Sequence, residues 1–190
     1  MQISITDIGE VILGHSFREA VKNDSNGNYF ILQAKNIDRD GKVETEDLPT
    51  TFLESTKRKA LVQDRDVILS NRGTFRAGVL YGNQKNILAA SSLYIIRMHE
   101  RERYLPEFLA IFLNSQAGQA LLEGMNRGTL IKSLPKGSLL ELPVPIPPLS
   151  TQQTVIDIHR NYSARSNLYE RKIRIEERIT NKTISTIISQ

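Results

Sequence analysis

The stretch of the chain that most constrains its fold is residues 142–153, which read LPVPIPPLSTQQ. Four of these residues are prolines, and each proline fixes its φ angle and lacks a backbone N–H donor. The segment therefore cannot form a helix or a central strand, and we predict an extended, stiff connector. At its end, Ser150 stands three residues before Gln153, which is the spacing of a helix capping box. Such a connector predicts a fixed geometry between a globular body and the following helix, as in a ruler or a dimerisation arm.

Residues 150–188 contain neither Gly nor Pro, which predicts one continuous helix. At about 1.5 Å per residue this helix is roughly 55–60 Å long. Its apolar residues recur at spacings of three, four or seven, although Arg165 and Glu176 interrupt the stripe. One helix cannot bury such a stripe alone, and with only one such helix in the chain a second chain is the favoured source of a partner. The positions expected in the contact are Val155, Ile158, Tyr162, Tyr169, Ile173 and Ile179.

The first 149 residues alternate short apolar runs with Gly- and Asn-containing turns, which predicts a curved, mostly antiparallel sheet. Small helices follow the strands in the sequence. We therefore predict an α+β fold, with one domain over 1–149 and a spacer or dimerisation helix over 150–190. The expected strands are 29–33, 66–70, 77–81 and 88–98, and the expected helical segments are 107–113, 118–125 and 135–140.

Several classes of protein are excluded or disfavoured by the composition. The chain has no cysteine, which excludes a disulfide scaffold, a thiolate metal site and a cysteine nucleophile. It shows no signal peptide and no apolar run long enough for a bilayer, so we expect a cytoplasmic protein without a membrane partner. P-loop, GxGxxG and zinc-ligand spacings are absent, as is an Asn-Pro-Pro-Tyr methyltransferase motif. These absences disfavour an enzyme, in particular one that modifies a base, and we expect no cofactor and no metal.

The distribution of charge suggests a polyanionic partner. The formal net charge is only +4, but residues 67–99 and 124–140 contain no acidic residue. Binding of a polyanion needs positive charge that neighbouring carboxylates do not cancel. Acid-free windows of this length also arise by chance. The charge distribution alone therefore leaves open whether the chain binds a polyanion or carries these windows by chance.

Two basic loops carry the side-chain types that read DNA. Residues 71–76 read NRGTFR and residues 125–132 read MNRGTLIK. Arg can contact guanine bidentately, Asn can contact adenine, and Thr can hold phosphate. A solvated turn is an equally good interpretation of each loop, and residues 33–36 form a weaker third candidate. The candidate DNA-binding residues are Gln33, Lys35, Asn36, Asn71, Arg72, Thr74, Arg76, Lys85, Arg127, Thr129 and Lys132.

A series of weak motifs, in this order, resembles one target recognition domain and one spacer helix of a type I restriction-modification specificity subunit. The most specific motif is the closing LPVPIPPL with Gln152 and Val155. The chain departs from the family at Arg65, where Gly is usual, at Thr151, where Glu is usual, and in having one recognition domain in place of two. The earlier motifs are Ile8-Gly9-Glu10, Ile31 to Ile37 with Gly41, Asp66 to Leu69 with Arg72-Gly73, Tyr104 to Ser115 with Gly118-Gln119, and Gly128, Ile131 and Leu134.

The resemblance implies a non-catalytic subunit that reads one DNA half-site in the major groove. It also implies that the long helix sets the half-site spacing and docks methyltransferase subunits, which carry S-adenosylmethionine, and through them the motor-nuclease subunits. A homodimer of such half-subunits would read an interrupted palindrome, and antiparallel helices are the simplest arrangement. The alternatives are a coiled-coil scaffold protein that does not bind DNA and, less favoured, a hydrolase with an undetected site.

Overall fold

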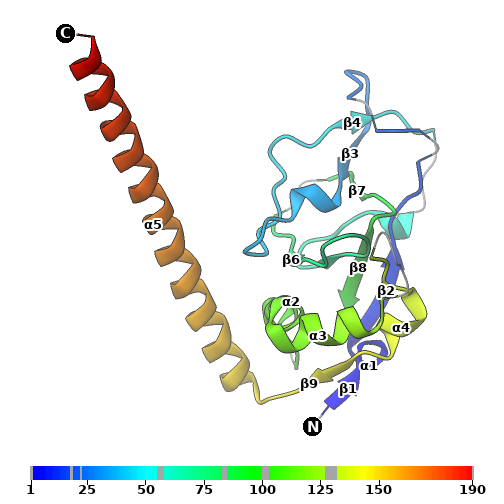
Figure 1. The fold of residues 1–190 in the computed structure, drawn as a ribbon. Helices are drawn as coiled ribbons and strands as arrows, with labels where there is room; N and C mark the ends of the chain where they lie inside the picture. The colour runs from blue at the N-terminus through cyan, green and yellow to red at the C-terminus, as the bar shows by residue number, and fades with distance from the viewer. Residues whose placement is uncertain are drawn as a thin grey trace. The chain divides into compact units, whose positions relative to one another are not determined.

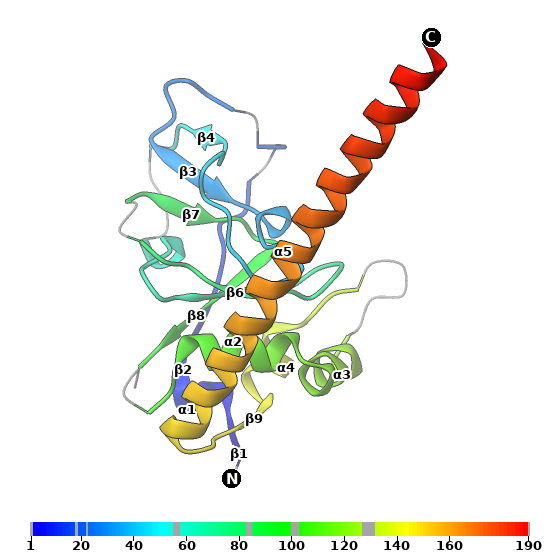
Figure 2. The same cartoon turned by 90° about the vertical axis from the view of Figure 1, so that its left-hand side faces the viewer.

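The computed structural model describes residues 2–17, 19–21, 23–54, 58–82, 85–99, 103–126 and 132–189. The chain divides into two compact units, residues 1–153 and residues 154–190. The first unit combines three small sheets with short helices, and the second is helical throughout its described length (Figure 1, Figure 2). The α+β prediction is thus confirmed, whereas the functional division at residue 150 stays a prediction.

A four-stranded sheet lies at the centre of the first unit. Its strand order is β2-β8-β5-β6, and every neighbouring pair is antiparallel. Sequence alone left residues 88–98 as either one long strand or two, and the structure resolves them into β7 and β8, which belong to different sheets. The bounds are β2 Gly9–Leu13, β5 Val67–Ser70, β6 Ala77–Val79 and β8 Leu93–Met98.

Two smaller sheets complete the strands of this unit. The three-stranded sheet has the order β4-β3-β7, in which β3 and β7 run parallel and β3 and β4 run antiparallel. The two-stranded sheet pairs β1 with β9 in antiparallel fashion. The bounds are β1 Gln2–Ser4, β3 Tyr29–Leu32, β4 Thr50–Thr51, β7 Ile87–Ala89 and β9 Pro143–Pro145.

Both faces of the central sheet are buried. Successive side chains of a strand point to opposite sides, so each strand contributes to two different clusters. In β5, Val67 and Leu69 pack in the cluster that contains the helix residues Leu109 and Leu113, whereas Ile68 packs in a second cluster with residues of β3 and β7. The helices therefore cover one face of the sheet, and the three-stranded sheet covers the other. The helical bounds are α1 Ile5–Ile8, η1 Ala34–Asn36, η2 Arg58–Ala60, α2 Pro106–Asn114, α3 Gln116–Gly124 and α4 Lys136–Leu140.

The break between α2 and α3 is shorter than the sequence suggested. We expected a break over 114–118 and a helix from Gly118, but Ser115 alone separates the two helices. The Ser115 hydroxyl accepts a hydrogen bond from the Gly118 amide at 3.2 Å, which caps α3. A Cβ at Gly118 would lie 2.1 Å from the Phe112 carbonyl oxygen, so this glycine permits the close turn between the helices.

The proline segment is part of the body and is not a free-standing connector. Strand β9 pairs with β1, and Val144, opposite Ile3, is fully buried. Prolines are tolerated here because β9 is the edge strand of a two-stranded sheet. The extended conformation is therefore confirmed, whereas the role of the segment as a spacer stays a prediction.

Helix α5 spans Leu149–Ile188, which confirms the long helix but shifts its start. Ser150 lies in the first turn of α5 and is therefore not the N-cap residue, in contrast to the prediction. The side chain that anchors this turn is Gln152, which is fully buried. Its Oε1 accepts from the Leu105 amide at 3.0 Å, and its Nε2 donates to the carbonyls of Arg103 at 2.9 Å and Pro147 at 3.0 Å.

The apolar stripe of α5 is largely exposed. Val155 is half-buried, whereas Ile158, Tyr162, Tyr169 and Ile173 are between 54% and 67% exposed. Ile179 is also exposed, but at about 100° per residue it lies some 240° around the helix from Ile173 and leaves the stripe. In the described part of the chain, no helix is both long enough and apolar enough to cross a membrane.

Replacing Gln152 with Ala is expected to lower the free energy of unfolding of the first unit by about 2–3 kcal/mol. The reason is that the Leu105 amide and the carbonyls of Arg103 and Pro147 lose the hydrogen bonds that they make with the fully buried Gln152 side chain. Urea unfolding of the full chain measures the change, and the exposed neighbour Thr151, replaced by Ala, is the matched control. Equal effects of the two substitutions would contradict the anchoring role of Gln152.

Candidate nucleic-acid interface

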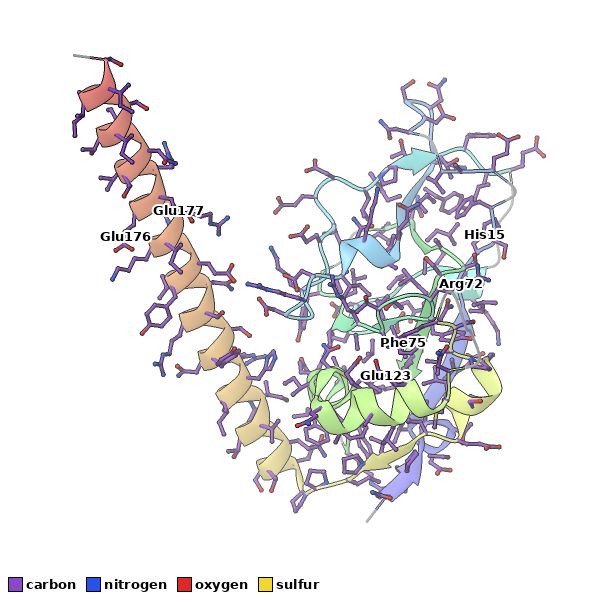
Figure 3. The ribbon with its side chains drawn as sticks, in the orientation of Figure 1. His15, Arg72, Phe75, Glu123, Glu176 and Glu177 are labelled. Atoms are coloured by element: carbon purple, nitrogen blue, oxygen red, sulfur yellow. The ribbon has the colours of Figure 1, made fainter. Side chains whose placement is uncertain are left out.

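The hairpin between β5 and β6 presents a short exposed tip. Arg72, Gly73 and Thr74 are exposed, whereas the flanking Asn71 and Phe75 are 4% and 3% exposed (Figure 3). Gly73 has a φ of +72°, a left-handed conformation that a glycine adopts without strain. The tip thus holds a cationic and a hydroxyl side chain in solvent between two buried residues.

This tip lies beside the end of the second predicted loop. Arg72 forms an antiparallel bridge with Ser133, and the Gly73 amide donates to the Lys132 carbonyl at 2.9 Å. The Leu134 amide donates to the Asn71 carbonyl, also at 2.9 Å. The structure therefore joins the 71–76 loop to the end of the 125–132 loop. Arg127 and Thr129 lie outside the described residues.

Asn71 is engaged in the interior and is not offered to a base. Its Nδ2 donates to the Ser91 carbonyl at 2.9 Å, and its backbone amide donates to the Ser92 carbonyl at 2.9 Å. With the contact from Leu134, Asn71 ties the hairpin to two other segments. A base contact by this side chain would break the buried bond to Ser91, so the geometry favours a structural role.

Arg76 connects the hairpin to the third candidate segment. Its guanidinium is half-buried and donates to the Ile37 carbonyl at 3.2 Å. Ile37 directly follows η1, which contains the candidates Lys35 and Asn36. Asn36 accepts a hydrogen bond from the Gln33 amide at 2.9 Å, whereas Lys35 is exposed. Arg76, Asn36 and Gln33 thus shape this surface, and Lys35 is the candidate that projects from it.

Lys85 does not join these segments. It precedes β7, which runs parallel to β3, so it lies level with the start of β3 near Tyr29. Gln33 and Lys35 follow the other end of β3. At about 3.3 Å per residue, the length of the strand separates Lys85 from the η1 segment. The sequence missed one exposed cation nearer the hairpin, Lys42, whose backbone bridges Val79 in β6.

Acidic groups moderate the charge of the surface. Lys132 forms an ion pair with Glu123, and both side chains are about half exposed. The Nζ of Lys42 lies 4.0 Å from Oε1 of Glu44. Because exposed ion pairs are weak, a polyanion can compete for these lysines.

Tyr94 is buried and hydrogen-bonds to the segment that follows Ser133 in the candidate surface. Its hydroxyl donates to the Leu134 carbonyl at 2.8 Å. Burial raises the pKa of Tyr94, and the nearby positive charge of Arg72 opposes this shift. The phenol therefore stays protonated at neutral pH and keeps its role as a hydrogen-bond donor.

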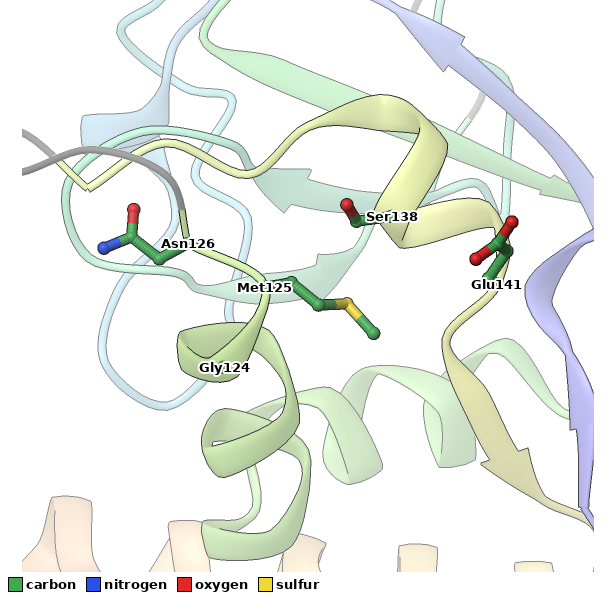
Figure 4. Close-up of a pocket in the computed structure, with 5 residues that line it drawn as sticks. All are labelled: Gly124, Met125, Asn126, Ser138 and Glu141. Carbon is green, nitrogen blue, oxygen red and sulfur yellow. The ribbon is translucent and has the colours of Figure 1, made fainter.

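An open pocket of about 450 Å³ lies between the end of α3 and α4 (Figure 4). Its lining contains one carboxylate and no basic side chain, which does not suit a phosphate group. Asn126 in this lining accepts a hydrogen bond from the Ser133 amide at 2.7 Å and so braces the candidate surface. Among the residues that the structure describes, no cluster of His, Asp or Glu suits a metal ion. The pocket is lined by Gly124, Met125, Asn126, Ser138 and Glu141.

Comparison with solved structures supports the fold. The S subunit of a type I restriction-modification system from M. genitalium superposes with a TM-score of 0.58 at 15% identity, over 87% of this chain and 39% of that chain. The HsdS subunit of Thermoanaerobacter tengcongensis gives 0.59 at 14% identity, over 90% and 39%. A chain from a structural study of type I complex assembly and conformational transition gives 0.66 at 15% identity, over 90% and 40%.

Comparison of sequences identifies the family. The type I restriction enzyme MjaVIII specificity subunit of Methanocaldococcus jannaschii is 22% identical over 156 residues. That alignment covers 82% of this chain but only 34% of the relative, so the chain spans about a third of the relative's length. A family model described as the type I restriction modification DNA specificity domain matches residues 1–181. The resemblance seen in the motifs is confirmed, and the chain belongs to the type I restriction modification DNA specificity domain family.

Proposed function

We propose that this chain is a sequence-specific DNA-recognition subunit of a type I restriction-modification system. The observation that carries the proposal is the junction of the exposed tip Arg72–Thr74 with the Lys132–Ser133 segment. This junction unites two loops from acid-free windows of the sequence into one surface. Family membership supports the same conclusion.

In this proposal, residues 1–149 read one DNA half-site in the major groove. Arg72 and Thr74 at the tip, with Lys35 and Lys132, contact the DNA, and Arg127 and Thr129 belong to the same loop as Lys132. Asn71, Arg76, Gln33 and Asn36 hold the loops in place through their hydrogen bonds. The subunit needs no cofactor and performs no catalysis of its own.

Residues 150–190 form the spacer that joins two such chains. Two copies of the chain would together supply two recognition domains and two helices. The exposed apolar stripe of α5 is the surface for this homodimer. The same helix docks methyltransferase subunits, which recruit the motor-nuclease subunits, and two-fold symmetry predicts an interrupted palindromic site.

A coiled-coil scaffold that does not bind DNA is the second candidate. The exposed stripe of α5 favours it as strongly as it favours the DNA-recognition subunit. The candidates differ only in DNA affinity, which decides between them.

Replacing Arg72 with Ala is expected to weaken binding to the selected site by about 1–3 kcal/mol and to relax the base preference at one position, as loss of a base contact does. The site is first selected from random duplexes with the methyltransferase complex, and fluorescence anisotropy then measures affinity. Lys85, replaced by Ala, removes the same charge away from the surface and is the control. Equal losses for Arg72 and Lys85 would contradict the assignment, and absence of DNA binding would favour the scaffold.

Removal of α5 after Gln153 is expected to convert a dimer into a monomer, since the stripe would be lost while the Gln152 anchor is retained. Light scattering on both forms measures the change. The full chain should show about twice the 21.5 kDa mass of one full chain, and the shortened chain should show the smaller mass of a single shortened chain. A full-length monomer would refute the homodimer and leave DNA recognition open.

A further inference from the structure

The arm of the hairpin that returns from the exposed tip to β6 is held largely by side chains. The Ser70 amide donates to the Arg76 carbonyl at 2.9 Å across the hairpin. Nearer the tip, the Ser70 hydroxyl donates to the Thr74 carbonyl at 2.6 Å and accepts from the Arg76 amide at 2.7 Å. Ser70 is 1% exposed, so water does not compete for these bonds. A buried hydroxyl inside the loop therefore fixes part of the tip's conformation.

An amide side chain holds the same arm from α3. Gln119 donates from Nε2 to the Phe75 carbonyl at 3.0 Å and to the Leu113 carbonyl at 2.7 Å. Leu113 lies in the last turn of α2, where carbonyls have no partner within the helix. One NH₂ group thus joins the end of α2 to the residue that directly follows the tip.

A second amide side chain belongs to Asn114, the last residue of α2. Its Oδ1 accepts from the Ala77 amide at 2.8 Å, and its Nδ2 donates to the Ala77 carbonyl at 2.7 Å. Ala77 begins β6, which is an edge strand of the four-stranded sheet. Backbone groups on the open side of an edge strand need a partner other than the sheet itself. Asn114 therefore takes the place of a neighbouring strand at this position.

The turn between α2 and α3 presents both amides to the hairpin. Ser115 caps α3, and Gly118 approaches the Phe112 carbonyl oxygen too closely for any larger residue. These contacts fix the positions of Asn114 and Gln119 relative to each other. Asn114-Ser115 and Gly118-Gln119 form one of the motifs through which the sequence resembles its family, and the function proposed above gives them no role.

We propose that Asn114 and Gln119 are positioning residues, which hold the tip Arg72–Thr74 in the conformation that discriminates between DNA sequences. This inference rests on the DNA-recognition function proposed above and assigns two further residues to its specificity. Both side chains are half-buried and act through the backbone of the returning arm, without contacting DNA.

Positioning matters more for reading bases than for holding the phosphate backbone. A side chain that reads a base edge must be held within about 0.5 Å of its productive position. Attraction between lysine or arginine and phosphates is independent of sequence and tolerates larger movements. Loss of either amide should therefore lower discrimination between sites more than it lowers affinity for DNA in general.

Gln119→Met in the full chain tests this role, because methionine is similar in length and cannot donate to the two carbonyls. The readout is the ratio of affinities for the selected site and for a site changed at the base pair where Arg72→Ala relaxes the preference. Gln119→Met should lower this ratio roughly tenfold. It should leave the affinity for an unrelated duplex at the same salt concentration within about threefold. Fluorescence anisotropy with the methyltransferase complex measures both quantities.

Combining the two substitutions distinguishes positioning from an independent effect. If Gln119 acts through the tip, Gln119→Met should lower the ratio by less than about twofold in a chain that already carries Arg72→Ala. Two losses that multiply would show that Gln119 acts independently of Arg72, which contradicts the proposal.

Two controls separate positioning from less specific causes. Gln116→Met makes the same substitution at an exposed position of α3 and should leave the ratio unchanged. Gln152→Ala also removes hydrogen bonds to two carbonyls, but at the start of α5, and is expected to lower stability without involving the hairpin. If Gln152→Ala reduced the ratio as much as Gln119→Met, loss of stability alone would explain the effect, and the positioning role would be ruled out.

A second variant covers the case in which Gln119→Met does not fold. Asn114→Asp has nearly the same shape and keeps the acceptor for the Ala77 amide, but it loses the donor to the Ala77 carbonyl. It should lower the affinity ratio in the same direction. Circular dichroism confirms folding of each variant before DNA is added.

Hydrogen–deuterium exchange of the full chain tests the clamp without DNA. Exchange over residues 71–79 should be faster in Gln119→Met and Asn114→Asp than in the natural chain, and unchanged in Gln116→Met. Unchanged exchange in this segment, or undiminished discrimination by folded variants, would overturn the positioning role and leave DNA recognition intact. A natural chain that discriminates between no DNA sites would overturn the proposed function together with this inference.

Discussion

Burial of both faces of the central sheet is the constraint on which the candidate surface depends. Val67 and Leu69 pack toward the helices, while Ile68 packs toward the three-stranded sheet. A strand enclosed in this way has no face left for solvent-exposed polar side chains. Side chains that contact a partner must therefore stand where the strands end, which is where Arg72, Thr74 and Lys35 are found. The cost of exposing the apolar core keeps these strand ends in fixed positions.

Local patterns predicted the elements well and their tertiary neighbours poorly. An apolar run predicted the strand that contains Val67, and the absence of Gly and Pro predicted α5. Both signals lie within one continuous segment of the sequence. The parallel pairing of β3 with β7 was not predictable, since it joins residues more than 50 positions apart. The burial of Asn71 was equally hidden, because its partner Ser91 is 20 residues away. Site residues could therefore be placed in loops, but their roles required the fold.

The departure of this chain from its family at Arg65 has a structural counterpart. Arg65 has a φ of +62°, in the left-handed region that favours glycine. Its Nη2 lies 3.1 Å from Oε2 of Glu107, and Oε1 of the same carboxylate accepts from the Tyr81 hydroxyl at 2.7 Å. Burial raises the pKa of Glu107, but its hydrogen bonds and the charge of Arg65 lower it further than burial raises it. The ionised carboxylate thus pairs with the Arg65 guanidinium and holds the Tyr81 hydroxyl.

The burial of the two residues that flank the hairpin tip determines which substitutions the tip tolerates. Asn71 and Phe75 hold the two sides of the tip in the interior, while the three residues between them are exposed. Exchange of Arg72 or Thr74 therefore leaves no cavity and requires no repacking. If these positions contact DNA as proposed, new side chains there change the contact without lowering the stability of the first unit. On the proposed function, different specificities are then compatible with one fold, because substitutions at these exposed positions do not destabilise it.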